Sequence, residues 1–308
     1  MANRSRGGGD GGGCARLLLA LLLCTLAGSL QALIGGQPDS VERYGFVVSL
    51  KSAPGQRCTA TKIGPRIFLT AAHCVVDIPA GTLGRPWQPG GKILVSNRAE
   101  PSGDSDYQTL NVTGTRLLES FASALSRLHA YQNARIAEYR GRYSGEDLAR
   151  RIRRLYMESH ITARFPDLAI VLVDDETPSI PVACVDLRRL VREADVILVG
   201  YGCERVAEAR RESAPVRRTW GRSRVIRVDA VNFYTFAGDL RPGSPAICPG
   251  DSGGPVLRDG KVVGVHGTVY GLGARDSARS NMSVNLHPLA GWDAWPQAAA
   301  TGGKSAQP

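Results

Sequence analysis

Residues 248–256 read Cys-Pro-Gly-Asp-Ser-Gly-Gly-Pro-Val, and the glycines in this stretch allow the backbone to curl around Ser252. A serine hydroxyl is inert at neutral pH, so hydrolysis by Ser252 requires a base to deprotonate it and a carboxylate to orient that base. The developing oxyanion also needs donors, and this turn can aim the N–H groups of Gly250 and Ser252 at one point. The stretch therefore predicts that Ser252 is a nucleophile, which requires a base and a carboxylate from elsewhere in the chain.

Two upstream segments supply those partners. Residues 70–74 read Thr-Ala-Ala-His-Cys and place His73 directly after a predicted strand, while Asp167 precedes the apolar run 168–173. A lone histidine, an aspartate at a strand start and a Gly-Gly-Pro turn are each common in structural roles. Their conjunction in the order His73, Asp167, Ser252 predicts a catalytic triad.

The segments TAAHC, DLAIVLV and CPGDSGGPV resemble the three signature segments of the trypsin-like serine proteases, and the resemblance spans residues 33 to about 295. It implies an all-β fold of two six-stranded antiparallel Greek-key barrels, with the active site between them. By the same resemblance His73 is the general base and then acid, Asp167 orients it, Ser252 forms the acyl-enzyme, and the amides of Gly250 and Ser252 make the oxyanion hole. The implied activity is that of a secreted serine endopeptidase acting on protein or peptide substrates, with no cofactor or metal.

The N-terminal segment has the features of a signal peptide. Three arginines precede the uncharged, Leu-rich stretch 17–26, which is too short to span a bilayer comfortably. We expect a signal peptide over 1–32, a first barrel over 33–180, a second barrel over 181–296 that includes a C-terminal helical turn, and a disordered tail over 297–308. This organisation predicts a secreted or periplasmic monomer with no membrane segment in its mature form.

A helical insertion interrupts the first barrel. Apolar residues recur at helical spacing in two stretches within 117–164, and the glycines of 141–145 separate them. Arginines at 150, 151, 153 and 154 give the predicted hairpin a basic surface, and the chain keeps a net charge of +8 of its +10 when 1–32 is removed. The hairpin either binds an acidic partner or is a solvated insertion without one. No nucleic-acid motif accompanies the charge, so we expect no nucleic acid as a partner.

Residues 33–36, Leu-Ile-Gly-Gly, resemble the Ile-Val-Gly-Gly terminus of the family, whose ammonium pairs with the aspartate just before the nucleophile. The resemblance implies an activating pair of Leu33 and Asp251. Residue 32 is alanine, so signal peptidase could cut there and free Leu33 directly. Cleavage after Ala27, which would leave 28–32 as a propiece, is the alternative.

The residues expected in the primary specificity pocket are Ala246, Ile247, His266 and Thr268. In the family the residue six before the nucleophile lies at the pocket base; here it is Ala246, so no aspartate is present to receive lysine or arginine. His266 resembles the pocket histidine of glutamyl endopeptidases, and the alternative is a histidine packed within a strand. A preference for acidic or for apolar residues therefore stays open.

Five cysteines remain after removal of 1–32, so at least one is unpaired within the chain. Cys58 and Cys74 match the family's bridge beside the base, and we expect a second bridge from Cys203 to Cys248. Cys184 is then free, and we expect it to be buried. The family resemblance also leaves two alternatives to an endopeptidase: a non-enzymatic binding protein on the same fold, and an esterase-like acyl hydrolase.

Overall fold

The computed structural model of the chain describes residues 33–52, 56–157, 161–203, 216–237, 244–270 and 280–292. The expected signal peptide and the expected disordered tail both lie outside the described residues. No helix in the described ranges is long and apolar enough to cross a bilayer.

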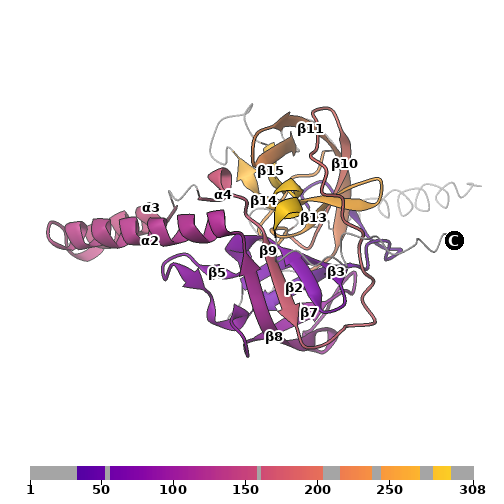
Figure 1. Ribbon diagram of the computed structural model, residues 1–308, viewed down its shortest axis with the longest axis horizontal. Helices are drawn as coiled ribbons and strands as arrows, with labels where there is room; N and C mark the ends of the chain where they lie inside the picture. The colour runs from indigo at the N-terminus through magenta and orange to yellow at the C-terminus, as the bar shows by residue number, and fades with distance from the viewer. Residues whose placement is uncertain are drawn as a thin grey trace, which may run out of the picture. The chain divides into compact units, whose positions relative to one another are not determined.

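The first half of the chain closes into a six-stranded antiparallel barrel (Figure 1). Its strands, in the order in which they pair around the barrel, are β2 (Val47–Ser52), β3 (Gln56–Gly64), β4 (Ile67–Thr70), β9 (Ala169–Val173), β8 (Gln108–Leu117) and β7 (Lys92–Ser96). These strands are rich in valine, isoleucine and threonine, which suit a pleated and largely buried backbone. Val48, Phe68 and Ile170 are among the side chains that fill the interior. Two short strands, β5 (Val76–Asp77) and β6 (Thr82–Leu83), form a separate hairpin.

The second half forms another closed antiparallel barrel. Its strands, in pairing order, are β11 (Thr219–Val228), β10 (Asp195–Gly200), β13 (Pro255–Arg258), β14 (Lys261–Tyr270), β15 (Ser280–Asn285) and β12 (Asn232–Phe236), and β12 pairs back with β11. The N-terminal strand β1 (Gln37–Pro38) adds to β11. The predicted fold class of two six-stranded barrels is confirmed.

The predicted helical hairpin stands between β8 and β9. It consists of α2 (Glu119–Arg140) and α3 (Gly145–Met157), followed by the short α4 (Ile161–Arg164). The first turns of α2 pack on the first barrel, because Phe121 and Leu125 are buried in its core. Figure 1 shows α2 and α3 running side by side and extending away from the strands. The insertion therefore adds its own surface without changing the barrel that it interrupts.

Short 3-10 helices complete the described structure. They are η1 (Ala72–Cys74), η2 (Arg85–Trp87), η3 (Asp104–Asp106) and η4 (His287–Gly291), and the last of them is the expected C-terminal helical turn. Among them η1 matters most for function, because it carries His73.

Candidate active site

Strand pairing brings His73 and Asp167 together. Strand β4 pairs with β9 in antiparallel register, with Thr70 opposite Ala169. The residues just after β4 therefore lie beside those just before β9. Asp167 accepts two hydrogen bonds from His73: the backbone N–H donates to Oδ1 at 2.8 Å, and the ring Nδ1 lies 2.6 Å from Oδ2.

The electrostatics of this pair suit a base. Asp167 is 1% exposed, whereas the ring of His73 keeps 23% of its surface in contact with solvent. Burial by itself would lower the pKa of His73, but the charge of Asp167 and its hydrogen bond together outweigh burial and raise it. A proton on Nδ1, held by the carboxylate, leaves Nε2 with a free lone pair that can accept a proton from a nucleophile.

Ser252 lies in the turn between Cys248 and Pro255. Gly250 and Gly253 have φ angles of +103° and +85°, a region that side chains other than glycine seldom adopt, and this curl presents the serine. The hydroxyl of Ser252 donates to the carbonyl of Gly267 at 3.2 Å. Within the described ranges it makes no hydrogen bond to His73, and contacts of this kind commonly tighten only when substrate binds.

Gly267 connects the serine to the carboxylate. Its carbonyl accepts a hydrogen bond from the Ser252 hydroxyl. A Cβ atom built on Gly267 would lie 3.8 Å from Asp167 Oδ2. The disulfide beside His73 gives a second link, because the sulfur of Cys74 lies 3.7 Å from the Ser252 carbonyl. The structure therefore gathers His73, Asp167 and Ser252 around one place where β4, β9 and the turn before β13 meet.

A family model for trypsin matches residues 33–116 and 124–292, which is most of the chain and includes all three of these residues. The chain belongs to the trypsin family. Among solved structures, a human heparin binding protein superposes with a TM-score of 0.53 at 16% identity, covering 82% of this chain and 92% of that one. A Glu endopeptidase superposes with a TM-score of 0.54 at 16% identity, covering 83% and 94%. At this identity both show the shared fold alone, and no curated protein sequence matches the chain.

Asp251, next to the serine of this trypsin-family chain, is a completely buried carboxylate. It accepts the N–H of Gly202 at 2.7 Å and the N–H of Cys248 at 2.8 Å. Burial raises the pKa of Asp251 to about 7, and the two hydrogen bonds only partly oppose that rise. None of the described cationic side chains pairs with Asp251.

Leu33, the expected partner of Asp251, is fully buried in the core of the second barrel. The next residue, Ile34, exchanges backbone hydrogen bonds with Ala246 at 2.9 and 3.0 Å. No hydrogen bond or ion pair joins Leu33 to Asp251 among the described residues, and the Leu33 nitrogen is here a peptide nitrogen bonded to residue 32. The segment that would carry a new terminus nevertheless already lies against the turn that precedes Ser252.

The four residues expected in the pocket occupy two neighbouring stretches. Ile247 is buried, and its N–H donates to Asn281 Oδ1 at 2.9 Å. His266 is fully buried in β14, with Nδ1 lying 3.3 Å from the Ser283 hydroxyl, and burial lowers its pKa to about 3. Thr268, two residues further along β14, is exposed. Segments 238–243 and 271–279, which flank these stretches in sequence, lie outside the described residues.

Both expected disulfides are confirmed. Cys58 bonds to Cys74 and Cys203 bonds to Cys248. The two sulfurs of the first bridge lie within 4.8 Å of a ring nitrogen of His73, but a disulfide offers no thiolate for a metal, so this group is not a metal site. The bridge instead fastens the loop that carries His73 to β3.

The expectation that Cys184 is buried was wrong. The residue is free, as expected, but it is exposed. Cys184 lies in extended chain between the barrels, where successive side chains point to opposite sides. Its neighbour Ala183 points inward and is 6% exposed, so the cysteine faces solvent.

A buried ion pair that no sequence pattern indicated lies where the two barrels meet. Arg218 and Asp39 are 0% and 1% exposed, and Arg218 Nε lies 2.7 Å from Asp39 Oδ2. The same guanidinium donates to the carbonyl of Asn97 at 2.6 Å and to the Tyr201 hydroxyl at 2.9 Å. Asn97 directly follows the first-barrel strand β7 and Tyr201 follows the second-barrel strand β10, so this network fastens the two barrels and the N-terminal segment together.

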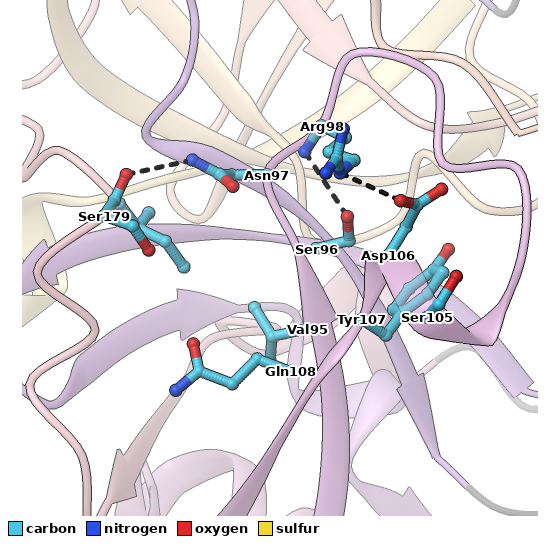
Figure 2. Close-up of a pocket in the computed structure, with 10 residues that line it drawn as sticks. Val95, Ser96, Asn97, Arg98, Ser105, Asp106, Tyr107, Gln108 and Ser179 are labelled. Carbon is cyan, nitrogen blue, oxygen red and sulfur yellow. Dashed lines mark hydrogen bonds and ion pairs between the residues drawn. The ribbon is translucent and has the colours of Figure 1, made fainter.

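A polar pocket of about 250 Å³ opens on the first barrel, and none of its lining residues belongs to the triad (Figure 2). Its lining comprises Val95, Ser96, Asn97, Arg98, Ser105, Asp106, Tyr107, Gln108, Ser179 and Ile180. Figure 2 shows Arg98 paired with Asp106, and Nε lies 2.9 Å from Oδ1. The pocket contains no residue that the sequence indicated as catalytic.

Proposed function

We propose that this chain is an exported serine endopeptidase that cleaves peptide bonds through an acyl-enzyme formed on Ser252. The observation that carries the proposal is the short contact between His73 Nδ1 and Asp167 Oδ2, at 2.6 Å, beside the Gly267 carbonyl that holds the Ser252 hydroxyl. A histidine oriented by a buried carboxylate is the base that a serine nucleophile requires.

In the proposed mechanism His73 Nε2 takes the proton of the Ser252 hydroxyl as its oxygen attacks the scissile carbonyl carbon. The amides of Gly250 and Ser252 then stabilise the oxyanion of the tetrahedral intermediate. His73 returns the proton to the leaving amine, and water hydrolyses the acyl-enzyme by the same steps. Asp167 stays ionised throughout and stabilises the imidazolium that forms at each step.

We propose a primary specificity other than trypsin-like. Asn281 is completely buried, and its side-chain amide accepts a hydrogen bond from the Ile247 N–H and donates one to the Pro245 carbonyl at 2.8 Å. The two neighbours of Ala246 in the chain are therefore held by a neutral amide, and not by a carboxylate that could receive lysine or arginine. The burial of His266, which keeps its imidazole neutral, favours a packed strand histidine and hence an apolar preference over an acidic one. A panel of peptides that differ only in the residue before the cut tests this; efficient cleavage after lysine or arginine contradicts it.

We propose that the active form begins at Leu33, whose ammonium pairs with Asp251. Asp251 is a buried carboxylate with no cationic partner among the described side chains, which supports this, since such a group is costly to bury until it is paired. Both disulfides and the family membership support export. N-terminal sequencing of the exported protein tests this: a start at Gly28 refutes direct cleavage after Ala32, and an active form that begins anywhere other than Leu33 overturns the Leu33–Asp251 pair.

A second candidate role belongs to the helical hairpin, which we propose binds an acidic partner. Arg150 is 71% exposed and Arg153 is exposed, although Arg150 and Arg151 both contact Asp147. The hairpin therefore presents positive charge on a surface that the barrels do not cover.

Charge reversal tests this role with a matched control. We expect R150E/R153E to release polyglutamate at lower salt than R222E/R224E, a pair on β11 with the same net charge. The control is close in design, because Arg224 is paired with Asp195 at 2.9 Å much as Arg150 is paired with Asp147 at 3.0 Å. Equal release by the two variants shows a general charge effect and removes the hairpin from the account.

The central experiment is cleavage-site profiling on a peptide library with a Ser252→Ala control, together with labelling by an organophosphonate. Labelling at Ser252 without any peptide cleavage favours an esterase-like acyl hydrolase. Absence of both favours a non-enzymatic binding protein on this fold.

A further inference from the structure

Thr59 touches the nucleophile turn from the opposite barrel. It lies in β3, directly after Cys58, and is completely buried. Its hydroxyl donates to the Gly250 carbonyl at 2.7 Å, and its backbone N–H donates to the Ser252 carbonyl at 2.8 Å. One residue of the first barrel thus holds the carbonyls of the two residues whose N–H groups are the proposed oxyanion donors.

The same hydroxyl is also held from behind. Tyr201 donates its backbone N–H to Thr59 Oγ1 at 3.0 Å, so the hydroxyl is an acceptor on one side and a donor on the other. The next N–H, that of Gly202, donates to Asp251. A short chain of hydrogen bonds therefore runs from the loop after β10 through Thr59 to Gly250, and a neighbouring bond from the same loop reaches the carboxylate of Asp251, between Gly250 and Ser252.

Gly250 needs such support because of its conformation. Its φ of +103° is open to glycine without strain, and glycine also leaves that region easily, so local sequence does not fix the peptide plane. The turn is packed closely at its far end: a Cβ atom on Gly253 would lie 2.2 Å from the Thr59 carbonyl and 2.1 Å from Thr70 Oγ1. At Gly250 a Cβ atom would lie 2.9 Å from the Tyr201 carbonyl; the Thr59 hydroxyl holds the Gly250 carbonyl, and the N–H of the same peptide, that of Asp251, donates to the Cys248 carbonyl at 2.9 Å.

We infer that Thr59 is a positioning residue for the oxyanion hole: its hydroxyl fixes the Gly250–Asp251 peptide and thereby the place of the Gly250 α-carbon, from which the oxyanion-donating N–H of Gly250 projects. Thr59 touches no substrate atom and acts through Gly250. The inference rests on the proposed serine hydrolase activity and adds to it a residue that the catalytic motifs do not include. It predicts that removing one hydroxyl from β3 weakens stabilisation of the transition state without weakening ground-state binding.

The test compares three variants in the full chain. Thr59→Val removes the hydroxyl at nearly constant volume, Thr59→Ser keeps it, and Thr61→Val makes the same change two residues along the same face of β3. Thr61 is the matched control, because it is also completely buried and its hydroxyl has no hydrogen-bond partner in the described structure.

We expect T59V to lower kcat by about 10- to 100-fold with KM changed less than about threefold, a fraction of what loss of a whole oxyanion donor costs. T59S and T61V should stay within about threefold of the unmodified protein. Affinity for a peptidyl aldehyde, which forms a tetrahedral adduct with the serine, should fall in T59V by the same factor as kcat/KM. Affinity for a cleaved-product peptide should not change.

Equal kcat in T59V and T61V overturns the inference, as does an equal loss of aldehyde and product affinity, which marks a general structural defect. If T59V does not fold by near-ultraviolet circular dichroism, Thr59→Ala takes its place, with T59S as the rescue. Failure of the proposed function looks different: the unmodified protein, T59S and T61V would then all lack hydrolysis and phosphonate labelling.

Discussion

We expect Asp251 to make the free energy of unfolding depend on pH, because the two hydrogen bonds that it accepts only partly offset the effect of its burial. Burial raises the pKa of this carboxyl from its ordinary 3.8 to about 7, so the folded protein holds a proton that the unfolded chain has released. Because the folded state then binds more protons, the free energy of unfolding falls as pH rises from about 4 to about 7. At about 1.4 kcal/mol per pKa unit, the full loss is about 4 kcal/mol.

Asp251→Asn removes this dependence, because an amide does not titrate. In a form that keeps residues before Leu33, and that carries Ser252→Ala against self-digestion, we expect the D251N variant to gain about 4 kcal/mol relative to its parent between pH 4 and pH 8. Urea unfolding at four pH values measures the difference directly, since other titrating groups are common to both proteins.

The same pair of proteins beginning at Leu33 gives the contrast. There the new ammonium can pair with Asp251, so the gain of the variant with pH should shrink or reverse. A stability difference that does not vary with pH in the longer form refutes the reasoning, because the carboxyl then titrates as it would in water.

Two further predictions follow from the site and from the seam between the barrels. Asp167→Asn should lower kcat by about 10³- to 10⁴-fold. The rising limb of kcat/KM against pH should also move to lower pH, because the carboxylate that raises the pKa of His73 has been replaced by a neutral amide. A rising limb that stays in place would show that a group other than His73 controls it. Arg218→Met should lower the free energy of unfolding by about 3–5 kcal/mol, because it leaves Asp39 buried and unpaired. Adding Asp39→Asn should recover part of that loss, measured by urea unfolding. A double variant no more stable than R218M contradicts the buried pair.

The fold class could be predicted because three short motifs resemble the signature segments of a family whose fold is known. The strand expected just before His73 is β4, the apolar run 168–173 became β9 nearly to the residue, and helical spacing gave the hairpin. Strand β12 (Asn232–Phe236) is rich in aromatic residues, but it is short and follows a turn-forming Asp-Ala-Val stretch, so its sequence gives no clear strand signal. The exposed Cys184 was missed because a cysteine's direction in extended chain depends on register, which the sequence leaves open.

The catalytic motifs were visible because their chemistry demands particular residues at particular places. The supporting contacts were not visible, because they depend on distance in space rather than on residue type. A threonine after a cysteine in β3 has no pattern that points to Gly250, and an arginine at 218 has none that points to Asp39. Both contacts cross more than a hundred residues of chain, and only the closing of the barrels brings them about.

The route by which the insertion returns to the barrel has a consequence for what the chain can tolerate. Helix α4 ends at Arg164, three residues before Asp167, and the carbonyl of Ala163 accepts a hydrogen bond from Asn232 Nδ2 at 3.1 Å. Asn232 is buried in the second barrel, so this contact anchors the returning chain before it reaches the carboxylate. Because this anchor comes before Asp167 in the chain, we expect that segments of quite different length can be grafted between α2 and α3 while the geometry of catalysis stays the same.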